Sequence, residues 1–326
     1  MLAVVTGGAG HLGTDLVASL RDGGHDVRVV DLREPATALA LGATWVRADV
    51  RDATAMRATF DGAAVVYHLA GVISVVGGLG GLVESVNVGG SRTVAEAALA
   101  AGVGRLVHCS SVHAFDLAAS VGRTVDESTA RCAGRRDAVY DRSKAAGEAE
   151  VRRVIERGLD AVVVNPTGVI GPRDEAPSRM GSVMLALWRR RMPALVGGGF
   201  DWVDVRDVTS AMLAAARRGR TGESYLLPGH AAAVPELAEL ARRCSHVDVA
   251  RRVAPLWAVG LTAPAATLLA RRTGNPLLPT REALRALRSF PRVDGSKAAR
   301  ELGHHPRPLS ETITDLHEYF VATGRL

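Results

Sequence analysis

Short apolar runs alternate with helical patterns along the first half of the chain. After the first apolar run, Leu12, Leu16, Val17 and Leu20 recur at the spacing of a helix face. Strands that alternate with helices in this way predict βαβ units, and therefore a doubly wound α/β fold with a parallel sheet. The runs that we interpret as buried strands lie at residues 2–5, 27–30, 44–46, 64–69 and 105–109.

The first strand runs into a glycine-rich turn that precedes a helix. Gly8, Gly10 and Gly13 have the G-x-G-x-x-G spacing of a dinucleotide-binding turn. Glycine allows the tight turn, the close approach of the backbone to a pyrophosphate and the packing of helix on strand, while the helix N-terminus attracts phosphate. An ordinary glycine-rich turn is the alternative. The residues that we expect to hold the pyrophosphate are Gly7, Gly10, His11, Leu12 and Gly13.

The residues that follow the next strands favour the dinucleotide. Asp31 ends the second strand, where a carboxylate would bind the adenosine ribose hydroxyls and repel a 2′-phosphate. We therefore favour NAD over NADP, although Arg33 could pair with a 2′-phosphate and keeps NADP open. Asp49, next to Val50, could bind the adenine, cap the following helix, or do both. Further contacts are expected from the residues after the fourth strand, which are Leu69, Ala70 and Gly71.

Composition and charge serve only to exclude some classes of partner and site. The formal net charge of +6 and the pI near 9.8 could suggest nucleic acid. The arginines are scattered among acids without a dense run, however, so we expect no nucleic-acid partner. Cys109, Cys132 and Cys244 are too few and too far apart for a disulfide framework or a zinc site, and we expect no metal. Because Leu2 already begins a strand, we expect no signal peptide and a cytoplasmic protein.

A tyrosine and a lysine begin a second strongly helical segment. Their four-residue spacing places Tyr140 and Lys144 on one face of a helix. A phenol titrates near pH ~10, but a neighbouring ammonium favours the phenolate and brings the phenol pKa toward neutrality. Chance pairing is improbable because Lys144 and Lys297 are the only lysines in the chain. A surface pair on an amphipathic helix is the alternative to an acid–base pair bound next to a nicotinamide.

Together these motifs resemble those of the extended short-chain dehydrogenases/reductases, over nearly the full length of the chain. Residues 6–13 match the cofactor turn of that family, and Ser111 matches its catalytic serine. Ser110 is the rival, but the spacing to Phe115 favours Ser111. The resemblance implies hydride transfer at a nicotinamide, with Ser111 binding the substrate oxygen, Tyr140 moving the proton and Lys144 tuning Tyr140. It also implies cofactor contacts at Asn87, Tyr140, Lys144, Pro166 and Gly168.

The resemblance also bears on the branch of the family. Sugar-nucleotide dehydratases have an Asp-Glu pair directly after the catalytic hydroxyl residue, whereas this chain has Val112 and His113 there, which disfavours dehydratase chemistry. His113 could bind substrate, donate a proton or be structural. We expect substrate contacts from His113, Val72 and Trp188. The end of the chain resembles dihydroflavonol-reductase-like, 3β-hydroxysteroid-dehydrogenase-like and hopanoid-associated epimerase-like members.

The segment at residues 253–270 carries no charge and lies between two arginine pairs, at residues 251–252 and 271–272. It is marginal in length for a transmembrane helix, and Pro255 and Pro264 interrupt it. It could contact a membrane surface peripherally, with its arginines at the headgroups, or form a buried cap helix over an apolar ligand. We favour the buried helix.

The sequence therefore predicts a dinucleotide-binding Rossmann domain at residues 1–165, to which residues 200–228 return. A smaller, mostly helical substrate-binding cap is expected at residues 166–199 and 229–326. The expected function is an NAD(P)-dependent oxidoreductase that interconverts a hydroxyl and a ketone or aldehyde on a fairly apolar small molecule. The alternatives are a sugar-nucleotide 4-epimerase and a non-catalytic dinucleotide sensor.

Two helical segments, near residues 94–101 and 145–155, have apolar faces. In members of the family that the chain resembles, such faces pair across a dimer. From the sequence alone they could equally bury against the sheet. We favour a homodimer.

Overall fold

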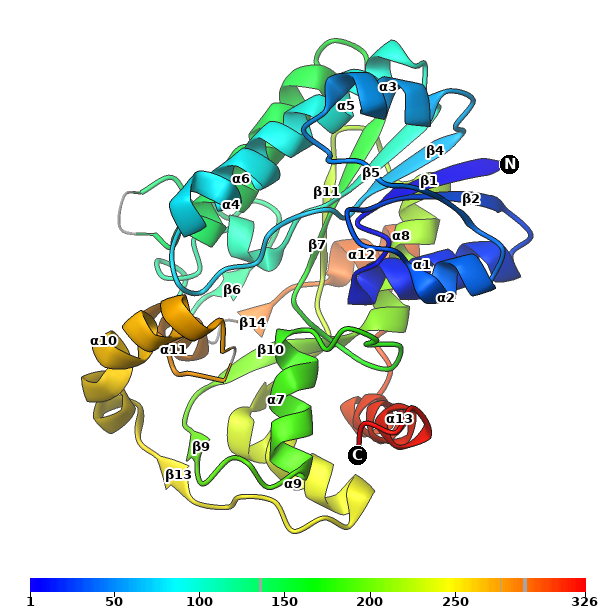
Figure 1. Cartoon of the computed structure of the whole chain (residues 1–326). Helices are drawn as coiled ribbons and strands as arrows, with labels where there is room; N and C mark the ends of the chain where they lie inside the picture. Colours follow the sequence, from blue (N-terminus) through cyan, green and yellow to red (C-terminus); the bar gives the residue numbers. More distant parts are fainter. Residues whose placement is uncertain (135–136, 276, 290–291) are drawn as a thin grey trace.

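The computed structural model describes residues 1–134, 137–275, 277–289 and 292–326, and it has two halves (Figure 1). The larger half is built on a seven-stranded sheet in the order β11-β7-β5-β4-β1-β2-β3. All neighbouring strands are parallel and the order reverses at β1, which confirms the predicted doubly wound sheet. Its strands are β1 (Leu2–Thr6), β2 (Asp26–Val30), β3 (Thr44–Val46), β4 (Val65–His68), β5 (Arg105–Cys109), β7 (Ala161–Pro166) and β11 (Ser224–Leu227).

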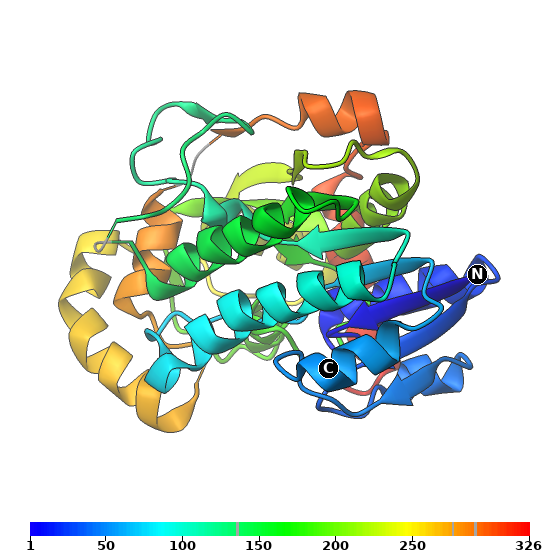
Figure 2. The ribbon, with the colours of Figure 1, turned by 90° about the horizontal axis from the view of Figure 1, so that it is seen from above.

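Helices cover both faces of this sheet because its strands are apolar on both sides. In β1, Ala3 and Val5 pack into one core and Val4 packs into the other. Figure 2 shows the two long helices α5 and α6 side by side over one face. One layer contains α1 (His11–Asp22), α2 (Ala36–Ala40), α8 (Val205–Arg218) and α12 (Ser296–Leu302), and the other contains α3 (Ala53–Phe60), α5 (Ser91–Ala100) and α6 (Val139–Ile155).

The apolar faces of α5 and α6 are used within the chain. Val94 and Ala98 of α5 pack with Val151 and Val154 of α6 in the core beneath the sheet. These faces were the reason for expecting a homodimer, so the homodimer stays a prediction without a surface assigned to it.

The helix predicted near residues 94–101 begins earlier in the chain and contains a wider turn. A 3₁₀ turn, η1 (Leu79–Gly81), and α4 (Leu82–Glu84) precede a π-helical turn, η2 (Ser85–Gly90), which continues into α5. Asn87 is buried in this π-helical turn. Such turns inside helices frequently occur at functional sites.

The smaller half, which we call the cap, contains short sheets as well as helices. Phe200 and Trp202 of its central strand β10 share a core with Ile313 and Phe320 of its last helix. After β10 the chain re-enters the larger half as α8 and β11, and later as α12. The elements of the cap are β8 (Gly168–Ile170), α7 (Arg179–Trp188), β9 (Leu195–Val196), β10 (Gly199–Asp204), β12 (His230–Ala233), α9 (Val234–Ser245), β13 (Val253–Ala254), α10 (Leu256–Thr273), α11 (Arg281–Arg288) and α13 (Leu309–Ala322), and a further pair joins β6 (Thr124–Val125) to β14 (Arg292–Val293).

The uncharged segment is not buried, so the favoured buried cap helix is wrong. In α10 only Ala263 and Ala270 are buried, while Trp257 is 70% and Leu261 is 76% exposed. The physical reason is that α10 packs against α11 on one side, while no described helix or strand covers its outer side. Within the residues that the structure describes, none of the helices has the length and apolar character that crossing a bilayer would need.

Candidate active site

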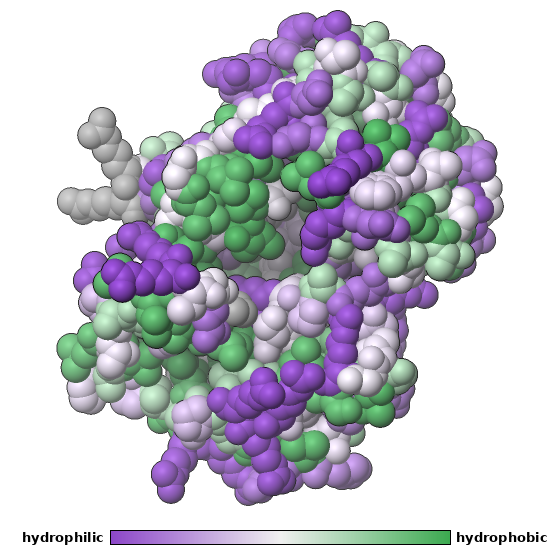
Figure 3. All heavy atoms as spheres, in the orientation of Figure 1, coloured by the Kyte–Doolittle hydropathy of each residue, from purple (hydrophilic) through white to green (hydrophobic). Residues whose placement is uncertain are grey.

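A cavity of about 1220 Å³ lies between the larger half and the cap. Residues at the carboxyl ends of β1, β2, β4, β5 and β7 line one side, and residues of α7 and α11 line the other. Figure 3 shows the hollow with apolar surface along its wall. Pockets for one drug-sized ligand measure about 300–1,000 Å³, so this cavity has room for a cofactor and a second small molecule.

The glycine turn at the base of the cavity has no room for side chains. Gly7 has a φ of +75°, and a Cβ there would come within 2.6 Å of the Ala70 nitrogen. A Cβ on Gly13 would come within 2.3 Å of the Gly7 carbonyl oxygen. No side chain caps α1 at Gly10, so the N–H groups of the first turn remain available to an anion. This cradle fits a dinucleotide pyrophosphate, and the predicted residues Gly7, Gly10, His11, Leu12 and Gly13 all line the cavity.

Asp31 lies at the end of β2, on the edge of the same cavity. Its carboxylate accepts hydrogen bonds from the backbone N–H of Ala9, at 3.0 Å, and of Arg33, at 2.9 Å. The Arg33 guanidinium donates to the Ala9 carbonyl at 3.0 Å. A carboxylate and a guanidinium therefore both stand beside the glycine turn, where the ribose of a dinucleotide would lie.

Asp49 lines the cavity with Val50 but does not cap a helix. Its carboxylate pairs with Arg51, with Oδ1–Nε and Oδ2–Nη2 distances of 2.9 and 2.5 Å, and the hydrogen bond with Arg51 lowers the Asp49 pKa. Asp52 caps α3 instead, accepting from the N–H groups of Thr54 and Ala55, both at 3.0 Å. The expected capping role of Asp49 is wrong because the helix begins three residues later.

Asn87 lies behind the cavity wall. Its amide oxygen accepts from the Val72 N–H at 2.7 Å, and its amide nitrogen donates to the Val72 carbonyl at 3.0 Å and to Ser143 Oγ at 2.9 Å. Through these hydrogen bonds the Asn87 side chain holds the segment after β4 against α6. Leu69, Ala70, Gly71, Val72, Pro166 and Gly168 line the cavity as expected, whereas Asn87 does not.

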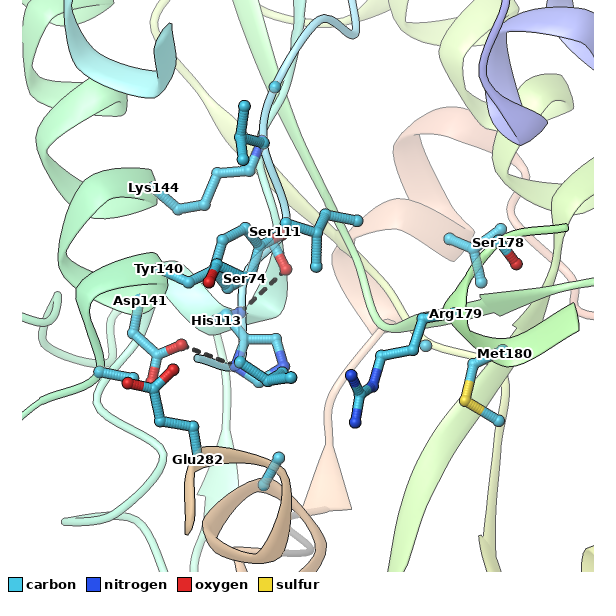
Figure 4. Close-up of a pocket in the computed structure, with 18 of the residues that line it drawn as sticks. Ser74, Ser111, His113, Tyr140, Asp141, Lys144, Ser178, Arg179, Met180 and Glu282 are labelled. Atoms are coloured by element: carbon cyan, nitrogen blue, oxygen red, sulfur yellow. Dashed lines mark hydrogen bonds and ion pairs between the residues drawn. The ribbon is translucent and has the colours of Figure 1, made fainter. Parts of the chain in front are cut away.

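Ser111, Tyr140 and Lys144, which we call the trio, meet in this wall (Figure 4). Ser111 follows β5, while Tyr140 and Lys144 lie one turn apart at the start of α6. The Ser111 hydroxyl lies beside the Tyr140 phenol and accepts a hydrogen bond from the His113 N–H at 3.2 Å. Lys144 Nζ donates to the Cys109 carbonyl at 3.1 Å. Ser110 also lines the cavity, but its hydroxyl is buried and has no hydrogen-bond partner among the described residues.

Burial dominates the electrostatics of the trio. It raises the pKa of the Tyr140 phenol above its usual value, and the neighbouring Ser111 hydroxyl offsets part of that rise. Burial also lowers the pKa of the Lys144 ammonium. The Tyr140 pKa is therefore raised and not lowered as expected, because burial disfavours the phenolate and Cys109 and Asp141 raise the pKa further.

His113 lies beside the trio and lines the cavity. Its ring stacks on Phe200, with centroids 5.5 Å apart, and meets the Tyr140 ring edge-on at 5.6 Å. Its Nδ1 lies 3.0 Å from the Asp141 carboxylate, which stands out of line with the ring N–H. The imidazole is thus held between an aromatic wall and a carboxylate, next to the candidate acid–base residue.

A family model described as the NAD dependent epimerase/dehydratase family matches residues 3–227, which include the glycine turn and the trio. The chain belongs to this family. Sterol demethylase protein B of Methylococcus capsulatus is 32% identical over the whole of both chains. A putative dihydroflavonol 4-reductase of Synechocystis is 29% identical over 98% of this chain and 94% of that protein. The crystal structure of gox2253 superposes with a TM-score of 0.86 at 30% identity, covering 100% and 99% of the two chains.

Membership of the epimerase/dehydratase family confirms the resemblance to extended short-chain dehydrogenases/reductases. The chain is therefore an NAD(P)-dependent oxidoreductase. The family model ends at residue 227, so it covers the glycine turn and the trio but not α10 or α11.

Trp188 does not contact this cavity, and its expected substrate role is wrong. It is 4% exposed in the cap core, where its indole N–H donates to the Ala241 carbonyl at 3.3 Å. Its ring packs edge-on against His317 and Phe320. Trp188 is the last residue of α7, and its side chain packs into the core of the cap and not toward the larger half.

Two charged residues of the cap face the cavity and were missed in the sequence (Figure 4). Arg179 begins α7 and Glu282 lies in the first turn of α11. The Arg179 guanidinium has no hydrogen bond or ion pair with another described residue, and burial alone lowers its pKa. One Glu282 oxygen is buried without a partner among the described residues. Nothing in the sequence distinguishes Arg179 from the many other arginines. Glu282 could have been noticed, because it is the first acidic residue after Asp248.

Proposed function

We propose that this protein interconverts a hydroxyl and a ketone or aldehyde on a fairly apolar small molecule, with Ser111, Tyr140 and Lys144 as the catalytic residues. The convergence of the trio beside the glycine turn, in one cavity, carries the proposal. A bound nicotinamide dinucleotide would supply or accept the hydride. The chain itself must then bind the substrate oxygen and move one proton.

Each member of the trio has a role that its position supports. In the direction of reduction, Tyr140 donates its phenolic proton to the carbonyl oxygen as the hydride reaches the carbon. The Ser111 hydroxyl donates a hydrogen bond to the same oxygen and stabilises the charge that develops on it. The Lys144 ammonium, held by the Cys109 carbonyl, stabilises the phenolate left on Tyr140. Oxidation of the alcohol reverses these transfers.

The adenosine end of the cavity favours NAD. Asp31 would bind the ribose hydroxyls, and its negative charge opposes a 2′-phosphate. Arg51 is paired with Asp49, whereas the exposed Arg33 donates one hydrogen bond to the Ala9 carbonyl, so Arg33 is the residue through which NADP could still bind. We propose that the dinucleotide contacts the glycine turn and the cavity-lining residues that follow β2, β4 and β7.

The cap side of the cavity supports an apolar substrate that also carries one polar group. The apolar residues facing it include Leu117, Met180, Val183, Phe200 and Leu278. Arg179 points into the same space without a partner among the described residues, so it can bind an anionic or strongly accepting substituent. We propose further substrate contacts from His113 and Val72.

The proposal is tested by titrating the purified protein with NADH and NADPH and then screening ketones for loss of the reduced nicotinamide absorbance. We expect tighter binding of NADH and turnover of apolar ketones. A UDP-sugar that is interconverted without net cofactor oxidation would replace the proposal with 4-epimerase chemistry. Binding of dinucleotide without turnover of any compound would favour a sensor.

A further inference from the structure

The helix α10 presents an apolar face that the rest of the described chain leaves uncovered. Trp257, Leu261 and Leu268 are 70%, 76% and 54% exposed. Their spacing places all three within one narrow stripe of the helix surface. Exposed apolar side chains that cluster in this way mark a surface that contacts another apolar phase.

The sequence of this segment carries charge of one sign. From residue 249 to residue 281 the sequence has no aspartate or glutamate, and it has five arginines, namely Arg251, Arg252, Arg271, Arg272 and Arg281. Arg251 and Arg252 precede α10, Arg271 and Arg272 lie in its last turn, and all four are exposed. Arg251 is paired with the exposed Asp248 at 2.9 Å. A helix that buries tryptophan and leucine and has arginines at its ends fits the headgroup region of a bilayer.

We propose that α10 docks on the surface of an anionic lipid bilayer, with Trp257, Leu261 and Leu268 inserted and the flanking arginines at the headgroups. The helix lies in the plane of the interface. Pro264 interrupts its hydrogen bonding, and none of the helices in the described parts of the chain can cross a bilayer. Charge complementarity selects anionic lipid over a neutral one.

The same charge opposes a second copy of this chain as the occupant. In a two-fold dimer through this face, each residue meets the same patch on its partner. Such a contact would bring two acid-free, arginine-flanked segments together, with no carboxylate within residues 249–281 to pair with them. The anionic surface of a lipid bilayer provides the opposite charge.

The docking surface adjoins the cavity. The helix α10 packs on α11, and residues 282–289 line the cavity wall. The Arg271 guanidinium donates to the Val76 carbonyl at 2.9 Å, and the neighbouring Val75 also lines the cavity. Docking would therefore hold the cavity beside the lipid, from which an apolar substrate could enter it. Only this link between docking and substrate rests on the proposed function.

The test is sedimentation of the full-length protein with phosphatidylcholine vesicles, with and without phosphatidylglycerol. We expect binding to the anionic vesicles, weakened by salt, and a loss of at least about tenfold in Trp257→Ser/Leu261→Ser, given the apolar area removed. The matched control is Val321→Ser, which removes a 52% exposed apolar residue of α13 and should bind like the wild type.

Three outcomes would overturn the proposal. They are wild-type protein that stays in the supernatant with anionic vesicles, binding that the double variant leaves unchanged, and a dimer by light scattering that the double variant abolishes. Circular dichroism and NADH binding should be unchanged in both variants, because all the altered side chains are exposed. Vesicle binding without ketone turnover would remove the proposed function and leave the docking surface standing.

Discussion

At the scale of single residues, the trio makes the sharpest prediction. Tyr140→Phe removes the only proton that the proposed mechanism donates to the substrate oxygen, and the ring remains to fill the buried site. We expect kcat to fall about 10²–10⁴-fold, the usual contribution of a general acid, with little change in NADH affinity. Stopped-flow or steady-state nicotinamide absorbance measures kcat, and fluorescence titration measures the NADH affinity. Unchanged turnover would remove Tyr140 from the mechanism.

Arg179 predicts how the cavity ranks substrates. If a ketosteroid acid and its neutral carboxamide are compared, the acid should have the lower KM in the wild type. Arg179→Gln should raise the KM of the acid about tenfold, the loss of one charged hydrogen bond, and leave that of the amide nearly unchanged. Arg179→Lys should restore part of the preference. Equal KM values for acid and amide in the wild type would contradict the assignment.

Two buried histidines predict acid sensitivity. Burial lowers the pKa of His68 to about 3 and that of His108 well below its usual value, and their rings lie 5.2 Å apart. The unfolded chain takes up these protons near pH ~6.5. The folded form therefore loses stability as the pH falls below that value, by about 1.4 kcal/mol per pH unit for each histidine, down to the folded pKa.

Urea unfolding between neutral pH and pH ~4 measures this slope. His108→Leu should flatten it, because one of the two histidines no longer titrates. His305→Gln, at an exposed position, is the control and should leave the slope as in the wild type. A slope that His108→Leu does not change would place the acid-sensitive groups elsewhere.

At the scale of elements, the glycine turn and α1 act as one unit. Gly13→Ala places a Cβ 2.3 Å from the Gly7 oxygen and 2.6 Å from Gly8 Cα, so the backbone must shift. We expect NADH affinity to fall at least about tenfold, because the first turn of α1 would no longer approach a pyrophosphate closely. Gly89→Ala, where a Cβ would meet nothing within 4 Å, is the control. Fluorescence titration measures the NADH affinity of both variants. Equal affinities would contradict the role of Gly13 in binding the pyrophosphate.

Elements were predictable where local chemistry decides them. Five of the seven strands of the sheet and the glycine turn followed from apolar runs and from backbone requirements that act within a few residues. The turn before α3 did not, because Asp49 and Asp52 are both suitable caps, and the helix start selects between them. The exposure of α10 was also hidden, since an uncharged segment has the same sequence whether protein or solvent covers it.

The trio shows the same limit within the site. Its members could be named from spacing, but the sign of the Tyr140 pKa change depends on burial, which only the packed structure gives. Trp188 was misplaced because a large aromatic near a predicted cleft can equally point into a core. Arg179 and Glu282 come from separate cap helices, and no local pattern joins them.

At the scale of the whole molecule, the two halves cannot be separated by a single cut. The chain enters the cap after β7, returns as α8 and β11, enters again at β12, and contributes α12 to the larger half and α13 to the cap. Limited trypsin cleavage after the exposed Arg272 should therefore leave two fragments that stay together. They should co-elute on native size exclusion and separate in denaturant, and separation under native conditions would contradict this.

The late return of α12 also has a consequence during synthesis. Ala298 and Leu302 are fully or almost fully buried against the same core as β1 and β2, so the first strands made share a core with one of the last helices. While the ribosome is still translating, that core lacks one of its walls. The glycine turn emerges first, but the half that holds it is completed only when residue 302 has left the exit tunnel. The core of the nucleotide-binding half is thus completed late in synthesis, and its apolar surface stays open to non-native contacts until then.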